Sequence, residues 1–296
     1  MSGGKKIWHW LVLTILSLIW GTSYILMKKG LESYSSIQIA SLRVFITFLC
    51  LLPFALKNIK KINRHNILSI SIIGFIGNAI PAFLFPMAET RIESSLAGML
   101  NSLSPVFTLL IGISIYRQKM IRTQIAGVLL GFIGAIGLLY NGSFALNYFG
   151  LFVVLATCFY GFSANEVSRI KELNGLQITS LAFFVIGPFA GIYLLFSDFS
   201  PAMVTQDWLR NLGYVAILAV MGSALALVLF YLLIRDTSPV FASIVTYFAP
   251  IVATLWGIGD NEHLTYPMLL SVVFIFAGVY IIYKPDLIRK ILNRFR

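Results

Sequence analysis

The sequence predicts an all-helical integral membrane protein, with ten transmembrane helices arranged as two inverted five-helix repeats. Composition is the first observation: of 296 residues, 58% are hydrophobic and 11% are charged. One water-soluble core cannot bury that much apolar surface. The second observation is an internal repeat, because the apolar stretch at 94–112 shares Ala, Pro, Leu and Gly with the stretch at 239–257 at matching positions.

Apolar segments of about 20 residues follow one another along the chain, and each is long enough to cross a bilayer. Lys5 and Lys6 before the first segment could indicate a signal peptide, but Trp20 and Tyr24 stand where small residues would be needed for cleavage. We therefore interpret it as the first span. The spans are expected at 8–27, 36–56, 67–86, 95–116, 122–140, 148–165, 177–197, 211–234, 239–259 and 266–283.

Basic residues gather on one side of the predicted membrane. Of the 22 Lys and Arg residues, Arg43 lies inside a span and only Lys28, Lys29, Arg91 and Arg210 fall on the other side. The positive-inside rule then places both termini in the cytoplasm, in a multi-pass protein of the cell (inner) membrane. This asymmetry accounts for the net charge of +11 and gives no reason to expect a nucleic-acid partner.

The repeat divides the chain into a first copy at 1–141, a second copy at 142–283 and a basic tail at 284–296. Five spans per copy is an odd number, so the second copy is expected to enter the membrane upside down. Inverted copies can open one central site to each side in turn. The apolar residues of the tail follow one helical face, which predicts an amphipathic helix on the anionic inner leaflet; a frayed, solvated end is the alternative.

Four stretches carry a resemblance to a known family: WGTSYILMKKG at 20–30, LRVF at 42–45, AGMLNSLSPVFTLL at 97–110 and FASIVTYFAPIVATLWGIGDNEHLT at 241–265. With them, the chain resembles the EamA family of the drug/metabolite transporter superfamily over essentially its whole length, in two copies. The resemblance implies two inverted five-helix repeats and transport of small metabolites, often export of amino acids or related compounds. Members of the family commonly carry Glu after the fourth and ninth spans; Glu262 fits, but the first copy has Arg117, Gln118 and Lys119 there.

Two prolines in the repeated stretches predict helix kinks near the middle of the membrane, at Pro105 and Pro250. Each removes a backbone hydrogen bond and leaves a carbonyl four residues earlier, at Asn101 and Thr246, in need of a polar partner. The neighbouring polar side chains either satisfy these carbonyls or line a cavity and contact substrate. They are Asn101, Ser102, Thr246 and Tyr247.

Arg43 is the one charge well inside a predicted span, which makes it a functional candidate by default. It could receive a substrate carboxylate through two parallel hydrogen bonds, or it could extend toward the membrane surface or pair with Glu89. Further candidates for contact with substrate lie in the helices that resemble the cavity-lining set of the family. They are Trp20, Tyr24, Asn78 and Tyr160.

These patterns predict a transporter of small organic metabolites that works by alternating access, with a channel or a non-transporting scaffold as the alternative. Neither of the two Cys residues nor any of the three His residues lies in a metal-binding spacing, so no metal, cofactor or enzyme activity is expected. The expected partners are a small-molecule substrate and the lipid bilayer; oligomeric state is left open. Because Glu89 and Glu166 fall at predicted span ends, we expect facilitated diffusion or weakly coupled export.

Overall fold

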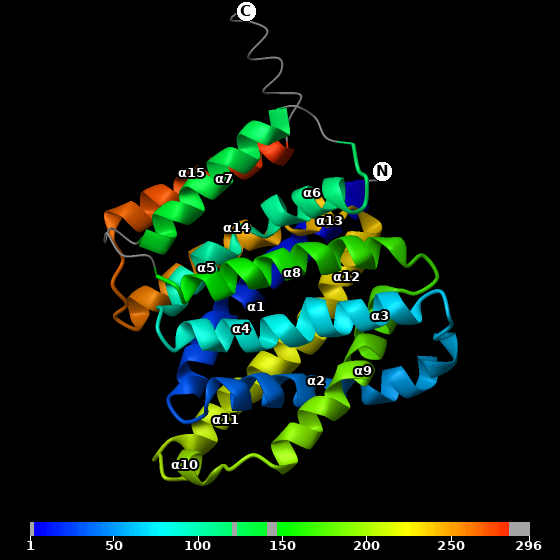
Figure 1. The fold of residues 1–296 in the computed structure, drawn as a ribbon, viewed down its shortest axis with the longest axis vertical. Coiled ribbons are helices and arrows are strands. Elements are labelled where there is room, and N and C mark those ends of the chain that lie inside the picture. Colours follow the sequence, from blue (N-terminus) through cyan, green and yellow to red (C-terminus); the bar gives the residue numbers. More distant parts are fainter. Residues whose placement is uncertain (1–2, 120–122, 141–146, 284–296) are drawn as a thin grey trace, which may run out of the picture.

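The structure, a computed structural model, describes residues 3–119, 123–140 and 147–283. Throughout these ranges the chain forms helices joined by short loops, and it has no strand (Figure 1). The predicted tail at 284–296 and the predicted boundary between the repeats lie outside the described residues. The all-helical fold class is therefore confirmed for the part of the chain that is described.

The first half of the chain begins with two long helices, α1 (Gly3–Leu31) and α2 (Ser36–Asn58), the second followed by a turn of 3₁₀ helix, η1 (Ile59–Lys61). A third membrane segment is assembled from α3 (Ile67–Gly74), the π-helical stretch η2 (Phe75–Ala79) and α4 (Ile80–Glu89). The fourth is divided into α5 (Ser94–Asn101) and α6 (Ser104–Ser114), and α7 (Thr123–Tyr140) completes the half.

The second half repeats this plan. It contains α8 (Gly150–Arg169), α9 (Gly175–Leu195) and a short α10 (Ser200–Met203). A segment built from α11 (Trp208–Ile217), the π-helical η3 (Leu218–Leu225) and α12 (Ala226–Asp236) follows. The last segments are α13 (Pro239–Ala242) with α14 (Val245–Gly259), and α15 (Tyr266–Tyr283).

The same local signals start equivalent helices in the two halves. Ser35 caps α2 by accepting the N–H of Gln38, whose side chain accepts the N–H of Ser35 in return, and Asn174 and Gln177 form the same reciprocal pair at the start of α9. Such capping boxes satisfy backbone donors that have no partner within a helix. The repeat visible in the sequence is thus also a repeat of local structure.

Eight helical segments of the described residues are long and apolar enough to cross a membrane. Two further apolar helices, Gln124–Tyr140 and Tyr266–Ile282, are shorter. At 1.5 Å per residue, a helix of about 17 residues is about 26 Å long, slightly less than a hydrocarbon core of about 30 Å. The structure therefore supports a multi-pass protein, while the count of ten crossings stays a prediction.

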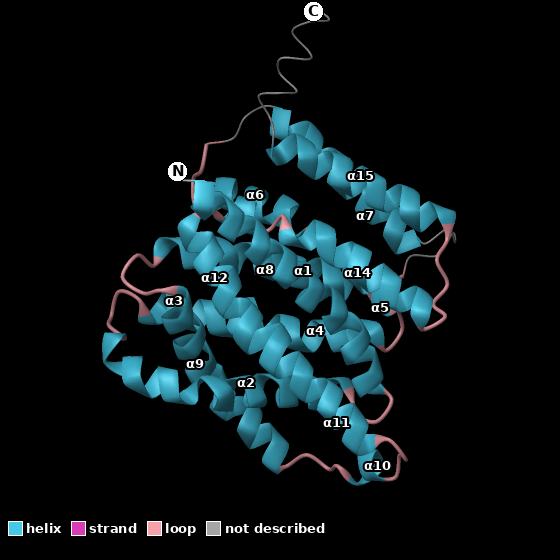
Figure 2. Ribbon diagram, turned by 180° about the vertical axis from the view of Figure 1, so that it is seen from behind, coloured by secondary structure: helices cyan, strands magenta, loops and turns pink. Residues whose placement is uncertain are grey.

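The two halves interlock instead of packing as separate bundles. The first helix of each half lies against the divided helix of the other, α1 against α14 and α8 against α6, and α2 packs on α9 (Figures 1 and 2). The last helices of the halves, α7 and α15, lie side by side at one edge of the molecule in both views. The centre of the bundle is consequently bounded by helices from both halves.

Glycines permit the closest of these contacts. A Cβ added to Gly127 of α7 would lie 2.3 Å from the carbonyl oxygen of Gly278 in α15, and one added to Gly278 would lie 2.4 Å from that of Gly127. Small residues that let backbones approach in this way are typical of membrane helix interfaces. Gly127 and Gly278 therefore serve the packing of α7 against α15 within the chain.

Candidate functional site

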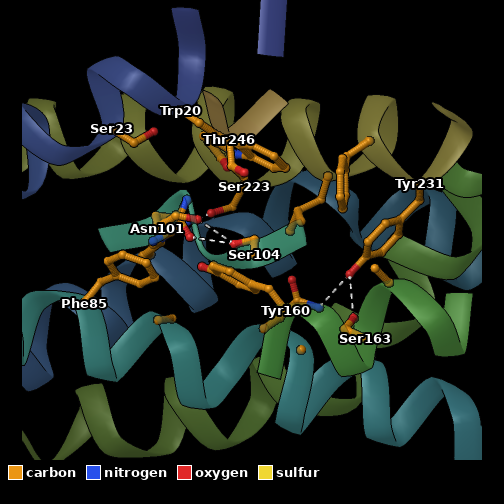
Figure 3. Close-up of a pocket in the computed structure, with 18 of the residues that line it drawn as sticks. Trp20, Ser23, Phe85, Asn101, Ser104, Tyr160, Ser163, Ser223, Tyr231 and Thr246 are labelled. Carbon is orange, nitrogen blue, oxygen red and sulfur yellow. Dashed lines mark hydrogen bonds between the residues drawn. The ribbon is translucent and has the colours of Figure 1, made fainter. Parts of the chain in front are cut away.

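A cavity lies at the centre of the bundle and is lined from both halves of the chain. Its walls come from α1, α2, η2, α4, α5, α6, α8, α9, η3, α12, α14 and the break before α14. Figure 3 shows side chains from these elements, among them Trp20, Tyr160 and Thr246, turned toward one another around this space. The centre of a water molecule can move through about 80 Å³ of it. One water needs about 10–15 Å³ by that measure, so the cavity has room for several waters or for a small solute.

Aromatic rings form much of the wall. Phe85 of α4 stacks on Tyr160 of α8 with ring centroids 5.8 Å apart, and its ring also lies 5.9 Å from that of Tyr24 in α1, in a tilted arrangement. Across the cavity, Trp20 packs edge-on against Phe230 of α12 at 5.0 Å. Rings held by other rings have few alternative rotamers, so this wall offers flat apolar surface to the apolar part of a solute.

Arg43 is the only residue with a charged side chain among those that line the cavity. Its Nε donates a 2.7 Å hydrogen bond to Oγ of Ser223 in η3, and its two terminal nitrogens form no hydrogen bond with any residue that the structure describes. The guanidinium group is thus fixed by one edge, while the other edge is free. A carboxylate could accept two parallel hydrogen bonds from that edge.

A chain of hydrogen bonds holds the divided helix of the first half in place. Ser104 Oγ donates to the carbonyl of Asn101, the one left without a backbone donor by Pro105, at 2.8 Å. The Asn101 amide donates to the hydroxyl of Tyr24 at 2.8 Å. The sequence-based expectation that a polar group meets this carbonyl is confirmed, and the same chain aligns three polar groups along the cavity wall.

The π-helical stretches place carbonyls and small polar groups at the cavity in both halves. In η2, the Asn78 amide donates to the carbonyl of Ile73 at 2.7 Å and to the hydroxyl of Tyr231 at 3.1 Å. In η3, the carbonyl of Gly222 accepts a hydrogen bond from Nε1 of Trp20 at 3.0 Å. A π-helical stretch leaves carbonyls without their usual partners, and here side chains of the cavity wall supply them.

Most of the candidate residues predicted from the sequence are brought together at this one place. The lining includes Trp20, Tyr24, Arg43, Asn78, Asn101, Tyr160 and Thr246. Ser102 and Tyr247 lie elsewhere: Ser102 is buried in the turn between α5 and α6, and Tyr247 packs edge-on against Phe276 of α15. Residues 102 and 247 face away because each follows a cavity residue by one position, about 100° around a helix.

The two predicted kinks differ. Helix α5 ends at Asn101, and α6 begins at Ser104, so the chain breaks just before Pro105. In the second half the break lies at residues 243–244, and α14 continues through Pro250. The N–H and the hydroxyl of Thr246 both donate to the carbonyl of Ser243, at 3.1 and 2.8 Å, and this tight turn fixes the break earlier than the proline.

Sequence analysis missed several lining residues, among them Ser23, Phe85, Ser163, Ser223 and Tyr231. The internal repeat held a signal for some of them. Ser223 stands in the repeat where Asn78 stands in the first copy, and Ser163 stands where Ser23 does. Contacts repeat as well, since a Cβ on Gly77 would meet Ser163 Oγ at 2.1 Å and one on Gly222 would meet Ser23 Oγ at 2.7 Å. Phe85 and Tyr231 are ordinary apolar-segment residues with no such signal.

Two acids that the sequence placed at span ends are buried inside the bundle. Glu89, the last residue of α4, is 7% exposed, and Glu166 of α8 is 2% exposed. Glu166 accepts hydrogen bonds from the hydroxyls of Ser69 and Tyr116. Both acids therefore lie inside the bundle, although the sequence placed them at span ends.

A network of charges closes the end of the bundle that is predicted to face outside. Glu262 accepts hydrogen bonds from the backbone N–H groups of Ser94 and Ser95 at the start of α5, at 3.0 and 2.9 Å, and its side chain pairs with Lys28 of α1 at 2.7 Å. Asp260 pairs with both Lys28 and Lys29 at 2.7 Å. These contacts join the two halves of the chain between the cavity and the predicted outer side.

The same contacts set the acidity of Glu262. Burial would raise the pKa of this carboxyl, but hydrogen bonds from Lys28, Ser94 and Ser95 outweigh that effect and lower the pKa from 4.5 to about 2. Glu262 is therefore charged at every physiological pH. Its negative charge stabilises this contact, because it neutralises Lys28 and accepts hydrogen bonds from two N–H groups at the N-terminus of α5.

The opposite end is closed by a related but uncharged contact. Gln118 donates from Nε2 to Oδ1 of Asn165 at 2.9 Å, and its backbone N–H donates to the carbonyl of Gly112 at 2.9 Å. Glu262 donates its own N–H to Gly257, the repeat partner of Gly112, at 2.9 Å. Gln118 thus occupies the place of Glu262 in the first copy, which accounts for the missing acid there. Nearby, burial and the hydrogen bond to Glu166 raise the pKa of Tyr116.

No group of three or more His, Cys, Asp or Glu side chains that could hold a metal ion occurs in the described part of the chain. The cavity itself offers one guanidinium edge, several hydroxyl and amide groups, and an aromatic wall.

Comparison with known proteins shows which family the sequence matches. The sequence pattern of the EamA-like transporter family matches residues 7–140 and again residues 148–284. Escherichia coli K12 has a relative described as the uncharacterized inner membrane transporter YedA, 27% identical over 253 residues, which cover 82% of this chain and 80% of the relative. A transporter of Archaeoglobus fulgidus is 23% identical over 281 residues, or 93% of this chain and 98% of that protein.

Protein PecM of Dickeya dadantii is 24% identical over 270 residues, covering 89% of this chain and 88% of PecM. One solved crystal structure superimposes on 91% of this chain and 94% of its own with a TM-score of 0.62, at 16% sequence identity. A likeness at that identity concerns the fold alone.

Proposed function

The chain belongs to the EamA-like transporter family, and from that premise we propose that it carries a small organic solute with a carboxylate, an amino acid or a related compound, across the cell membrane. The solute occupies the central cavity. Its carboxylate meets the free edge of Arg43, and its apolar part lies against the aromatic wall.

Arg43 is the observation that carries this proposal. An arginine within a membrane segment costs a few kcal/mol on insertion scales and is retained where it faces a partner or a cavity. Here one hydrogen bond to Ser223 orients the guanidinium, and no described residue neutralises it by an ion pair. An anionic group of the solute would supply that neutralisation, while a purely cationic solute would meet repulsion.

The remaining lining groups fit the rest of such a solute. Tyr24, Asn78, Asn101 and Thr246 present hydroxyl and amide groups to the cavity, and Trp20, Phe85 and Tyr160 present ring faces. Polar groups at fixed positions in an otherwise apolar pocket set the orientation of a ligand. We assign these residues to solute binding on that ground.

Transport proceeds by alternating access, with export as the direction implied by the family resemblance. Two observations support the mechanism. The cavity lies between two repeated halves, and separate contacts close the two ends: Lys28 with Glu262 at one, Gln118 with Asn165 at the other. If each contact opens while the other holds, the site faces one side at a time. Both termini are proposed to lie in the cytoplasm.

The test compares metabolites released by cells that overproduce the chain, or its Arg43→Ala, Asn101→Ala or Arg210→Ala variant. Arg210 is an exposed arginine that pairs with Asp207 at 2.8 Å, so its variant is the matched control. Overproduction should raise the release of one or a few carboxylate metabolites. Arg43→Ala should abolish the rise, Asn101→Ala should reduce it, and Arg210→Ala should preserve it. An identical secreted profile in all strains would contradict the proposal.

A further inference from the structure

Glu89 has a buried carboxyl group that forms neither a hydrogen bond nor an ion pair with any described residue. Neither carboxyl oxygen touches solvent, and neither has a hydrogen-bond partner among the described residues. Glu166, equally buried near the other end, differs because two hydroxyls donate to it. An ionised carboxylate without hydrogen bonds in an apolar interior is far less stable than the neutral acid.

Its position follows from the helix that carries it. Phe85 lines the cavity, and Glu89 follows it by one turn on the same face of α4. On the facing helix α1, Tyr24 packs against Phe85, and Lys28 follows Tyr24 by one turn. A layer formed by Tyr24 and Phe85 therefore separates the cavity from a second layer that holds Glu89 and Lys28.

The charges around Glu89 come from several elements. Helix α1 supplies Lys28, α2 supplies Arg43, and the loop after α14 supplies the anion Glu262, whose repulsion is the largest of these charge effects on Glu89. Neither cation forms an ion pair with Glu89: Lys28 binds Asp260 and Glu262, and Arg43 binds Ser223 through one edge of its guanidinium.

Two tyrosines and several groups near the start of α5 also lie in the region around Glu89. Tyr24 of α1 and Tyr160 of α8 are the nearby titratable side chains of the cavity layer. The start of α5 presents only the serines that bind Glu262, and Glu93, which precedes α5, accepts the backbone N–H of His263. No described group donates a hydrogen bond to Glu89 or forms an ion pair with it in this arrangement, and Lys28 and Arg43 act on its carboxyl only from a distance.

We propose that Glu89 is a proton-binding site and that its carboxyl must carry a proton for the Lys28–Glu262 end of the bundle to close while no solute is bound. This inference rests on the proposed transport function. When that end opens, water reaches the carboxyl and it can release its proton to the solution there. When the layer of Tyr24 and Phe85 parts in the other state, the carboxyl can exchange its proton through the cavity with the opposite side.

The opposite step, made with solute bound, proceeds without this proton, so one proton is bound on one side and released on the other in each cycle, and solute flux is coupled to the proton gradient. The carboxyl is unchanged after the cycle, and no other reactant is consumed. A one-for-one exchange would permit a concentration ratio of about tenfold for each unit of pH difference.

The experiment uses the purified full chain in proteoliposomes, with a mixture of ¹⁴C-labelled amino acids as the probe. Exchange of internal for external label is measured at equal pH on both sides, and net flux is measured with and without a pH difference of about one unit. The variants are Glu89→Gln, which mimics the protonated acid, and Glu93→Gln as the control at the same end of the bundle. Wild type and Glu93→Gln should show net flux that rises several-fold with the gradient. Glu89→Gln should still exchange label but show no response to the gradient.

A Glu89→Gln variant that responds to the gradient as wild type does would overturn the proton site. If wild type exchanges none of the label, the proposed solute is wrong, and a solute-free measurement decides the proton site. In that case Ser23→Cys, in a chain with Cys50 and Cys158 replaced by Ala, is labelled with a membrane-impermeant maleimide at several pH values. Relative to the same protein carrying Glu89→Gln, its accessibility from the outside should rise several-fold as pH increases. Equal pH dependence in both proteins would contradict the proposal.

Discussion

Arg43 and Glu89 show two states in which a single ionisable residue can exist inside this bundle. Arg43 stays charged because one edge of its guanidinium is bonded to Ser223 and the other faces a cavity that can hold water or solute. Glu89 has neither a bonded partner nor a cavity. This difference is the reason for which we propose that Arg43 binds solute and Glu89 binds a proton.

A substitution at Gly77 tests how tightly the cavity wall is packed. A Cβ at this position would lie 2.1 Å from Oγ and 2.4 Å from Cβ of Ser163, so Gly77→Ala must displace Ser163. Overpacking of this kind costs about 1–3 kcal/mol, and thermal unfolding in detergent should begin several degrees lower. Gly213→Ala is the control, because nothing lies within 4 Å of its added Cβ; it should be neutral or stabilising. Equal unfolding temperatures for the two variants would contradict the packing.

The contribution of Glu262 to the stability of the fold should depend on pH. Its pKa in the folded protein, about 2, is below its value of 4.5 elsewhere, so its contribution to stability is complete above about pH 4.5 and is lost as pH falls toward 2. The unfolding temperature of wild type should exceed that of Glu262→Gln at neutral pH, and the difference should shrink as pH falls below about 4.5. A difference that stays constant with pH would show that the carboxylate contributes nothing by its charge.

At the scale of elements, the repeated π-helical stretches and divided helices position the site. Hydropathy located these membrane segments from the sequence, because it depends on composition averaged over about 20 residues. The break before Pro105 was predictable, since the proline removes a donor. The break at 243–244 was not, because it depends on how Thr246 bonds to Ser243 and on no residue type that marks a break.

The contact between α7 and α15 yields a prediction at this scale. Gly127→Leu would push side-chain atoms into the carbonyl of Gly278, which lies 2.3 Å from the position of an added Cβ. The two helices should then separate, and cysteines placed across this contact should cross-link several-fold less efficiently than in wild type. Leu129→Ala, at a position of α7 that is 59% exposed, is the matched control and should cross-link as wild type does. Unchanged cross-linking in Gly127→Leu would show that α7 and α15 do not meet here.

For the whole molecule, the decisive property is that the two halves of the chain share one cavity. The sequence made that property predictable, because the repeat and the odd number of predicted spans per copy both lead to it. It could not predict that Glu89 would be covered, since burial at the end of a span depends on how neighbouring loops fold over it. Nor could it place Phe85 and Tyr231 in the lining, since an aromatic residue in an apolar segment faces lipid, core or cavity according to helix rotation alone.

The most direct test of the account is the accessibility of Ser23→Cys, on the cavity wall, in a chain with Cys50 and Cys158 replaced by Ala. A membrane-impermeant maleimide is added from either side of sealed vesicles, with and without Glu262→Gln, which weakens closure at the predicted outer end. The account predicts labelling from both sides, with a several-fold gain from the predicted outer side and a loss from the other side in the Glu262→Gln protein. Labelling from one side only, or a gain on both sides at once, would contradict a single cavity that opens alternately.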